Sequence, residues 1–524
     1  MQAQNPAMTL STVGQLISDL ARAHGTRVAL TFPELGAQFT FSDLDLLATA
    51  VAKNLYRRGF RKGDRLAVWA NNIPEWIILQ FATARIGVVI VTVNTGLRRH
   101  ELKYLLNQCE ARGLALVRSF RGIDFVAELE AVRGELPHLH EVFVLPDDFG
   151  GLSAATPDPL PKVDLRPDEC INMQYTSGTT GFPKGVMLSH RNILKNGFDL
   201  GSGLRFSPDD SLCLTVPLFH CFGCVIGVLG AYTHAATIVA LTEFNPERVL
   251  DAVHNHRCTV LYGVPTMFIA ELNHPNFGKY NLSSLRTGIM AGAPCPRETM
   301  KAVVEKMGAR EMTIAYGLTE ASPGVTLTAP DDSLDVRVST VGRVLPDVEI
   351  KLVDPVTKED LPAGREGELA TRGYHVMLGY YNMPEETRTA IRDGWLMTGD
   401  LATIDEQGYV RITGRSKDLI IRAGENIAPR EIEEVLLTHP DIVEAYAYGV
   451  PSEFFGQQVA AAIRLKPNAR PNPDGIRQFC VDRMAKFKAP EFIEFVDSFP
   501  TTPSGKVQKY KLAESWLARQ KAPL

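Results

Sequence analysis

The chain has 524 residues, more than one hydrophobic core usually organises, so we expect two or more domains. Apolar residues make up 45% of it, as in ordinary soluble globular proteins. Asp+Glu (60) and Lys+Arg (55) nearly balance, giving a net charge of −5 without long single-sign blocks, which disfavours nucleic acid or an anionic membrane as the main partner.

The sequence predicts a cytoplasmic protein. Residues 1–10 lack the basic segment and apolar core of a secretion signal, and no run of about eighteen apolar residues occurs. The best candidate for a membrane span, 66–93, is interrupted by Glu75 and Arg85. We therefore predict no transmembrane segment and at most peripheral membrane contact. The eight scattered cysteines are typical of reduced thiols rather than of a disulfide framework.

The first part of the chain alternates between helical and strand patterns, as a layered α/β domain should. Apolar residues at helical spacing predict a helix over 43–57 with Ser42 as its N-cap. Further apolar runs predict strands at 65–70, 88–93, 212–216, 237–241, 259–262 and 313–316. The segment 157–167 is the nearest to a flexible connector.

The pattern changes after Gly394. Residues 408–414 alternate as in a half-buried strand, and polar residues 415–418 separate them from the apolar run 419–421. A short charged segment between two strands suits either a hinge or an exposed hairpin turn. The remainder, 418–524, is long enough for a small α+β domain.

The most informative segment is 175–185, Tyr-Thr-Ser-Gly-Thr-Thr-Gly-Phe-Pro-Lys-Gly. Its glycines allow close backbone approach, its hydroxyls donate hydrogen bonds and Lys184 adds a positive charge, which together suit a polyphosphate. A solvated turn would explain the glycines but not the lysine and the hydroxyls. In a Walker loop the lysine follows the second glycine directly, whereas Phe182 and Pro183 separate Gly181 from Lys184 here, so that class is excluded.

Two further segments carry polar or small residues at strand ends. Residues 316–320, Tyr-Gly-Leu-Thr-Glu, end a predicted strand, where ligands bind in parallel sheets. Tyr316 could stack on a purine and Glu320 could hold Mg²⁺, although an acid after a threonine also begins many helices. Gly292-Ala293-Pro294 could let the backbone approach an adenine, or form an ordinary turn.

The run 216–221 ends in His220 and Cys221. The histidine is either a hydrogen-bonded core residue or part of a site. Cys221 and Cys224 have redox-motif spacing, but without a second ligand pair of matching spacing we favour a role as small buried hydrophobes. The glycines that follow leave room for an alkyl chain or for close helix packing: Gly223, Gly227 and Gly230.

The run 175–185 resembles the signature of the adenylate-forming superfamily, which includes acyl-CoA synthetases, peptide-synthetase adenylation domains and beetle luciferases. The resemblance extends roughly from Phe39 to Leu512, because further motifs follow in the family's order. It is strongest to medium-chain fatty acyl-CoA synthetases at 416–426 and 217–221. The other matching motifs are Tyr316–Glu320, Thr398–Asp400, Gly414–Asp418 and Pro503–Lys506.

The resemblance implies an α/β fold with a large layered N-terminal domain of mixed sheets and helices, plus a small mobile α+β C-terminal domain. It implies an adenylation domain over 1–414, a hinge at 415–417 with Lys417 at the pivot, and a mobile domain over 418–524. Rotation would then bring different groups to the same acyl carbon in the two half-reactions.

The implied activity is that of an acid–thiol ligase that uses ATP, Mg²⁺ and coenzyme A. A carboxylate, from a medium- or long-chain fatty acid, forms acyl-AMP and pyrophosphate, and the thiol then gives acyl-CoA and AMP. An aryl-CoA ligase and a stand-alone enzyme loading a separate carrier protein are alternatives; a luciferase-like oxygenase and a noncatalytic nucleotide-binding protein are remoter ones. The oligomeric state stays open, a homodimer included.

The resemblance also assigns residues. Lys506, His220, Thr176 and Glu320 are the predicted catalytic residues, with Glu320 also holding the metal. Lys506 would reach the substrate carboxylate and the α-phosphate, and the motif of His220 would gate the path between thiol tunnel and acyl pocket. The ribose would be bound by Asp400 and Arg415. The full predicted set of nucleotide- and CoA-binding residues is Thr176, Ser177, Gly178, Thr179, Thr180, Gly181, Lys184, Gly292, Ala293, Pro294, Tyr316, Gly317, Thr319, Asp400, Arg415 and Gly424.

Overall fold

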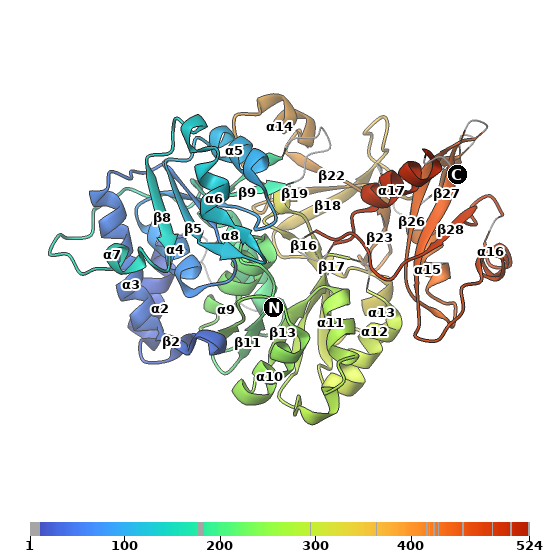
Figure 1. Cartoon of the computed structure of the whole chain (residues 1–524), viewed down its shortest axis with the longest axis horizontal. Helices are drawn as coiled ribbons and strands as arrows, with labels where there is room; N and C mark the ends of the chain where they lie inside the picture. The colour runs from blue at the N-terminus through green and yellow to red at the C-terminus, as the bar shows by residue number, and fades with distance from the viewer. Residues whose placement is uncertain are drawn as a thin grey trace. The chain divides into compact units, whose positions relative to one another are not determined.

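The computed structural model of the chain contains two compact units (Figure 1). The first comprises the residues up to Glu349 together with Thr371–Leu396, and the second comprises Ile350–Ala370 and the residues from Met397 onward. The structure describes residues 11–176, 183–293, 295–362, 364–415, 418, 420–422, 425–427, 429–452, 455–484, 486–502 and 506–521.

Two large mixed sheets organise the first unit. Over the described residues, one sheet has the order β17-β16-β15-β14-β13-β11-β12-β1-β2 and the other β20-β10-β9-β4-β3-β5-β8. The first is built from β1 (Val28–Phe32), β2 (Ala37–Thr40), β11 (Ser211–Leu214), β12 (Thr237–Ala240), β13 (Val260–Gly263), β14 (Thr287–Ala291), β15 (Glu311–Gly317), β16 (Gly324–Leu327) and β17 (Arg343–Val344). The second is built from β3 (Arg65–Trp69), β4 (Val89–Thr92), β5 (Gly113–Val117), β8 (Glu141–Leu145), β9 (Cys170–Thr176), β10 (Lys184–Ser189) and β20 (Gly379–Tyr380).

The predicted strands of this unit are confirmed. They correspond to β3, β4, β11, β12, β13 and β15, with ends that differ from the predicted ones by a few residues. β11 to β15 are mutually parallel, and their apolar side chains pack against α10 (Pro246–His256), α11 (Pro265–Leu272) and α12 (Arg297–Ala302) (Figure 1). The layered α/β architecture expected for the large N-terminal part follows from this arrangement.

The helix α8 (His190–Gly203) links the two sheets of the first unit, because it contacts β9 and β10 of one and β16 of the other. It packs closely against the π-helix η3 (Phe222–Leu229). The remaining helical segments of the unit are α2 (Val13–His24), η1 (Pro33–Leu35), α3 (Phe41–Arg57), α4 (Pro74–Arg85), α5 (Arg99–Gln108), α6 (Phe125–Glu130), η2 (Arg133–Glu135), α7 (Phe149–Leu152), α9 (Gly230–Tyr232), η4 (Phe277–Lys279), η5 (Val303–Met307), η6 (Thr319–Ala321), α13 (Leu334–Ser339) and α14 (Pro384–Ala390). A small hairpin joins β6 (Ser119–Phe120) to β7 (Ile123–Asp124).

The helix expected over 43–57 begins earlier, and the expectation that Ser42 caps it is wrong. Thr40 is the N-cap: its backbone is extended, its hydroxyl accepts from the amide of Asp43, and the Asp43 carboxylate accepts from the amide of Thr40. Phe41, the first helical residue, is completely buried. Burial of that ring and the reciprocal capping box place the N-cap two residues before Ser42.

The glycines after His220 could leave room for an alkyl chain or allow close helix packing. At two of them the structure favours close packing. A Cβ at Gly223 would lie 2.2 Å from the carbonyl oxygen of Pro217, and one at Gly227 would lie 2.6 Å from a methyl of Leu214. Both positions are occupied by neighbouring protein atoms rather than by open space. These two glycines therefore let η3 approach β11 closely.

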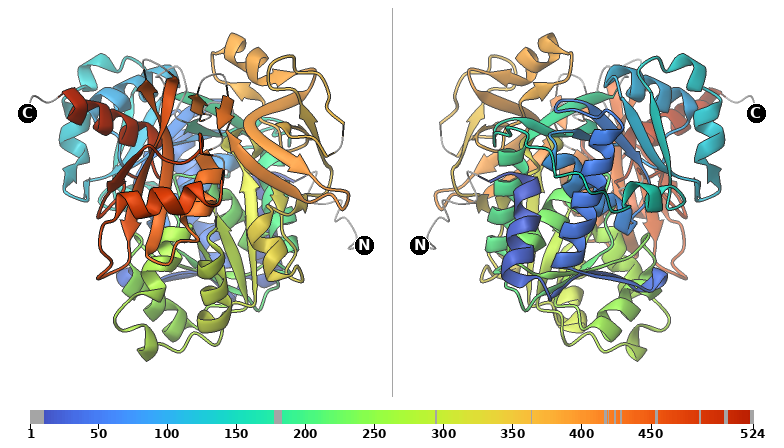
Figure 2. Two further views of the ribbon diagram at one scale, coloured as in Figure 1. Left: turned by 90° about the vertical axis from the view of Figure 1, so that its right-hand side faces the viewer. Right: turned by 90° about the vertical axis from the view of Figure 1, so that its left-hand side faces the viewer.

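The second unit has its own sheet (Figure 2), and its buried apolar side chains form their own core. Over the described residues the sheet order is β25-β24-β27-β26, with β28 beside β27. Its elements are β24 (Ile420–Arg422), β25 (Glu425–Ile427), α15 (Pro429–Leu436), β26 (Ile442–Ser452), β27 (Gly456–Leu465), α16 (Pro473–Val481), β28 (Phe492–Phe495) and α17 (Lys509–Lys521). This small α+β unit is as expected.

The chain passes between the units within three strands, β18 (Val348–Val353), β19 (Gly367–Gly373) and β22 (Trp395–Ile404). In the first unit β22 pairs with β21 (Ile391–Arg392), and in the second it pairs with β23 (Val410–Arg415). The strand predicted over 408–414 is thus confirmed as β23. Of the predicted hinge 415–417, residues 416 and 417 lie outside the described residues, so the pivot at Lys417 stays a prediction.

Candidate active site

Two paired antiparallel strands, β9 and β10, flank the predicted phosphate-binding run. β9 ends at Thr176, β10 begins at Lys184, and these two residues face each other in the strand register. The strand pairing thus brings the backbones of the threonine and the lysine side by side. The predicted loop residues Ser177, Gly178, Thr179, Thr180 and Gly181 lie outside the described residues.

Glu320 lies at the same place. It belongs to the short helix η6, just after β15, and its Oε1 is 3.5 Å from the hydroxyl of Thr176. Its main-chain carbonyl accepts from the amide of Met377 at 2.9 Å, which fixes the backbone. Two motifs that are 144 residues apart in sequence, one ending in Thr176 and one in Glu320, therefore meet in the first unit.

Tyr380 completes this group and was not predicted from the sequence. Its hydroxyl donates to Oε1 of Glu320 at 2.9 Å, and its ring centre lies 5.0 Å from Nζ of Lys184. Burial, and then the neighbouring carboxylate, raise the pKa of Tyr380, so its hydroxyl stays a donor at neutral pH. The strand β20 pairs with β10 through Val186 and Tyr380, and this pairing brings the tyrosine to the hairpin.

The carboxylate of Glu320 suits a divalent cation. Its Oε1 accepts both hydrogen bonds described above, and Oε2 makes none among the described residues. Mg²⁺ takes one or two carboxylate oxygens and completes its shell with phosphates and water. Glu320 therefore fits the predicted metal role, with Oε2 as the available oxygen.

The ends of two neighbouring parallel strands carry the residues predicted for the adenine. Gly292 and Ala293 follow β14, and Tyr316 and Gly317 end β15; the strands pair with Ala291 opposite Ala315. Gly292 has a φ of +87°, which favours glycine. A Cβ at Gly317 would lie 1.8 Å from the carbonyl oxygen of Pro323, so packing alone requires a glycine there. Pro294 lies outside the described residues, and Thr319 begins η6 beside Glu320.

His220 lies two residues before the first residue of the π-helix η3. Its Nδ1 accepts from the amide of Phe222 at 3.1 Å. The residue is half-buried rather than enclosed in the core. Its gating role stays a prediction.

Cys221 and Cys224 are fully buried, as expected for small interior residues. The side-chain amide of Gln174 bridges the two cysteines, a feature that the sequence did not indicate. The thiol of Cys221 donates to Oε1 of Gln174 at 2.8 Å, and Nε2 of Gln174 donates to the sulfur of Cys224 at 3.2 Å. Burial raises the pKa of Cys221 well above its usual value and that of Cys224 to about 12, so both stay protonated thiols.

In the second unit, Asp400 lies in β22 opposite Arg415 of β23. It is 4% exposed, and its amide donates to the hydroxyl of Thr398, which in turn donates to the carbonyl of Leu369. Strand pairing thus brings the backbones of the two predicted ribose residues together. Gly424 lies outside the described residues.

Lys506 closes a turn in the second unit. Its carbonyl accepts from the amide of Thr502 at 2.7 Å, and its amide donates to the hydroxyl of Thr502 at 3.0 Å. A bridge between Thr501 and Val507 lies just outside this pair. The backbone of the predicted catalytic lysine is therefore fixed on both sides of the turn.

No helix among the described residues is long and apolar enough to cross a membrane.

The comparisons with known proteins cover almost the whole chain. The family described as AMP-binding enzyme matches residues 17–381, and the AMP-binding enzyme C-terminal domain matches residues 431–506. The assumed acyl-CoA synthetase YngI of Bacillus subtilis (strain 168) is 48% identical over 96% of this chain and 97% of its own. The mitochondrial medium-chain acyl-CoA ligase ACSF2 of Danio rerio is 39% identical over 96% of this chain and 88% of its own.

Solved structures show the same fold. The ATP-bound crystal structure of MatB from Rhodopseudomonas palustris has a TM-score of 0.87 at 32% identity, covering 98% of this chain and all of its own. The anthranilate CoA ligase AuaEII in complex with anthranoyl-AMP has a TM-score of 0.90 at 27% identity, covering 98% of each chain. The chain therefore belongs to the AMP-binding enzyme family, the adenylate-forming superfamily that includes the acyl-CoA synthetases.

Proposed function

We propose that the protein joins a medium-chain fatty acid to coenzyme A in two steps, by way of an acyl-AMP. The observation that carries this proposal is the meeting of Thr176, Lys184 and Glu320 at the mouth of the hairpin loop. A hydroxyl, an ammonium and a carboxylate at one glycine-rich turn suit a metal-bound triphosphate. Family membership supplies ATP and CoA as the co-substrates of this chemistry.

In the first step the substrate carboxylate attacks the α-phosphorus of ATP and pyrophosphate leaves. Lys184 and the glycine-rich loop would bind the departing phosphates, and Glu320 Oε2 would hold Mg²⁺, which offsets their negative charge. Lys506 would place a positive charge where negative charge develops between the carboxylate and the α-phosphate. Preorganised charge of this kind typically contributes about 10²- to 10³-fold in rate.

In the second step the CoA thiol displaces AMP from the mixed anhydride. Direct attack of a thiol on a carboxylate would have to expel oxide, so adenylation supplies the leaving group. We infer that the mobile part, 418–524, turns about 415–417 with Lys417 as the pivot, against an adenylation domain over 1–414. Gly424 would then line the thiol path, and His220 would gate it toward the acyl pocket.

The relatives named medium-chain acyl-CoA ligases support the choice of a medium-chain acid. The likeness to a ligase of the aromatic acid anthranilate supports an aryl acid as the second candidate. Asp400 and Arg415 would bind the ribose, and Tyr316, with Gly292 and Ala293, would surround the adenine. We propose a cytoplasmic location, with the acid, ATP and CoA as the partners.

The deciding experiment incubates the purified protein with MgATP, CoA and acids from acetate to palmitate, plus benzoate and cinnamate. AMP and acyl-CoA are measured by mass spectrometry. We expect AMP with a medium-chain acyl-CoA, and Glu320→Gln should lose both products. Formation of aryl-CoA instead would show that the substrate is an aromatic acid. Acyl-AMP without thioester would indicate a carrier protein or another acceptor. The absence of acid-dependent AMP would refute the ligase activity.

A further inference from the structure

A hollow of about 260 Å³ lies in the first unit, at the beginnings of the parallel strands β3, β4 and β9. Its wall includes Arg65, Val89 and Cys170, which begin or nearly begin those strands, and Met187 near the end of β10. Thr176 ends β9, and six residues of extended strand separate it from Cys170, which is about 20 Å. Cys170 is therefore far from Thr176, whereas Met173 and Tyr381, which also line the hollow, are nearer to that end of the strands.

The interior of the hollow is mostly apolar. Val89, Leu165, Met173 and Met187 line it, and Met173 and Met187 face each other across the β9–β10 pairing. Cys170 adds a thiol whose pKa burial raises to about 12, so it stays uncharged at neutral pH. This lining suits an apolar chain rather than a fully polar ligand.

A buried histidine is the first polar feature of the hollow. His190 lines it and is only 1% exposed. Its Nδ1 accepts from the amide of Val13 at 3.1 Å, so the proton of the neutral ring resides on Nε2. Nε2 makes no hydrogen bond to any residue that the structure describes. Burial lowers the pKa of His190 to about 4, so the ring is a neutral donor without an acceptor.

Lys62 is the second polar feature. Its ammonium donates to the carbonyl of Asp164 at 2.6 Å and to Glu169 at 2.7 Å, which leaves one of its three N–H donors unused. Arg65 also lines the hollow, and it is paired with Glu110 at 2.9 Å, so its charge is already balanced and Lys62 is the cation with a donor to spare. An acceptor with one negative charge would satisfy both unused donors.

We propose that this hollow binds a small monocarboxylate, with the carboxylate at His190 and Lys62 and the alkyl chain along Met173, Met187 and Val89. A hollow of about 260 Å³ has room for an acid with a short alkyl chain, such as heptanoate. The site is separate from the acyl site of the proposed reaction and does not depend on it.

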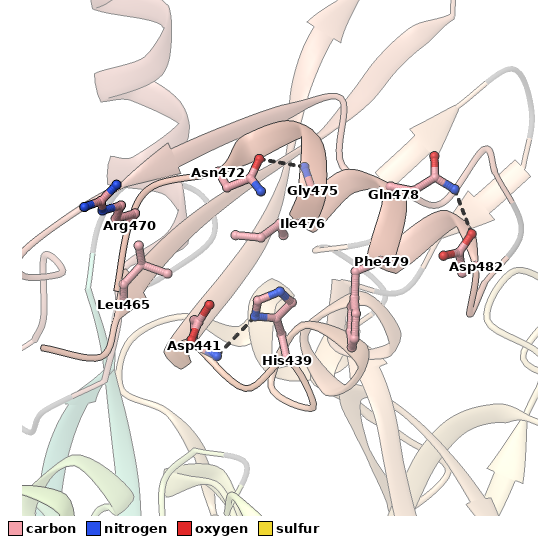
Figure 3. Close-up of a pocket in the computed structure, with 10 residues that line it drawn as sticks. All are labelled: His439, Asp441, Leu465, Arg470, Asn472, Gly475, Ile476, Gln478, Phe479 and Asp482. Carbon is pink, nitrogen blue, oxygen red and sulfur yellow. Dashed lines mark hydrogen bonds between the residues drawn. The ribbon is translucent and has the colours of Figure 1, made fainter. Parts of the chain in front are cut away.

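A larger hollow in the second unit, of about 360 Å³, does not have these features (Figure 3). Its histidine, His439, is half-exposed and accepts from the amide of Asp441. Asn472 accepts from the amide of Gly475, and Gln478 donates to Asp482, so these side chains bond within their own segment (Figure 3). The buried, unpartnered donor that marks the hollow of the first unit has no counterpart among these described residues.

The test is a calorimetric titration of heptanoate into the full-length protein after the nucleotide site has been filled with heptanoyl-sulfamoyl-adenosine. We expect one heptanoate per chain. Lys62→Met should weaken binding at least tenfold by removing the charge, and Leu165→Trp should abolish it by filling the hollow. The matched control is Lys103→Met, which removes an exposed lysine paired with Glu135 in the same unit and should leave the affinity unchanged.

Three results would overturn the proposal: no heat from heptanoate, equal affinity in all variants, or equally tight binding of uncharged heptanamide. Thermal unfolding checks that each variant is folded, and Lys62 is 40% exposed, so its replacement should be tolerated. Failure of the sulfamoyl-adenosine to bind would count against the proposed ligase function, whereas the comparison of the Lys62 and Lys103 variants would still decide the heptanoate site.

Discussion

The hydroxyl of Tyr380 donates a 2.9 Å hydrogen bond to the same carboxylate oxygen of Glu320 that lies 3.5 Å from the hydroxyl of Thr176. The hydroxyls of Tyr380 and Thr176 thus hold Oε1 of Glu320 and thereby fix the direction of Oε2. The carboxylate is supported by one residue from each of two strands, β9 and β20, that flank β10 in the same sheet. A metal-binding carboxylate works best when neighbouring hydrogen bonds fix it in this way.

Tyr380→Phe should therefore weaken use of the metal without removing the carboxylate. We expect ATP–pyrophosphate exchange to need about tenfold more Mg²⁺ for half-maximal rate, as typically follows loss of such a supporting bond. The control is Tyr381→Phe, because the hydroxyl of Tyr381 donates to Glu110 and not to Glu320. An unchanged Mg²⁺ dependence in Tyr380→Phe would show that the tyrosine does not position Glu320.

Lys506→Ala should separate the two half-reactions. We expect acid-dependent ATP–pyrophosphate exchange to fall about 10²- to 10³-fold, while thioester formation from supplied acyl-AMP is spared. Lys511→Ala, which removes an exposed lysine in the same unit, is the matched control. Equal losses in both assays would reject a role specific to adenylation.

Lys417→Pro tests the proposed pivot. Proline fixes its own φ and restricts the residue before it, so it should hinder rotation at 415–417. We expect thioester formation to slow more than adenylation, measured as acyl-CoA release against pyrophosphate exchange. Normal overall turnover would exclude Lys417 as the pivot.

The sequence predicted those parts of the site that are local in the chain. The glycine-rich run and the end of β15 were recognisable because each carries its chemistry within a few residues, and in the structure Thr176 and Glu320 lie 3.5 Å apart. Tyr380 was missed because it lies far from Lys184 in sequence and reaches it through the pairing of β20 with β10. A single sequence does not reveal which distant strands pair.

Packing decided the details that sequence patterns left open. Thr40 and Ser42 are both good capping residues, and burial of Phe41 between them selects Thr40. Gly227 could have faced a channel, but the space beside it holds Leu214. Both outcomes depend on neighbours that only the folded chain brings close.

The ion pair between Lys509 and Glu433 should be a main stabilising contact of the second unit. The two atoms are 2.6 Å apart, and the glutamate side chain is 9% exposed and also accepts from the amide of Ala447 at 2.8 Å. Lys509→Met would leave this carboxylate without its cation, so we expect a loss of about 3 kcal/mol in unfolding free energy, measured in urea. Glu431 lies on the same helix and pairs with Lys488 at the surface, so Lys488→Met should cost less than about 1 kcal/mol. Equal losses in the two variants would contradict the importance of burial.

His375 should make the first unit less stable in acid. It is completely buried, its Nδ1 has no hydrogen-bond partner, and its Nε2 lies 2.9 Å from the hydroxyl of Thr371. Burial lowers its pKa from the usual 6.5 to about 4, so the unfolded chain takes up a proton at a higher pH than the folded one. The contribution of His375 to the unfolding free energy is therefore constant above pH 6.5. It is lost as the pH falls from 6.5 to 4, and the total loss is about 3 kcal/mol.

His375→Gln should remove that part of the pH dependence while keeping a side chain that can bond to Thr371. The measurement is the unfolding free energy in urea at several pH values between 7 and 4. The control is His138→Gln, which replaces an exposed histidine and should leave the wild-type slope intact. If His375→Gln retains the full slope, the acid sensitivity arises elsewhere, and the other buried histidine whose pKa is lowered to about 4, His190, becomes the next residue to replace.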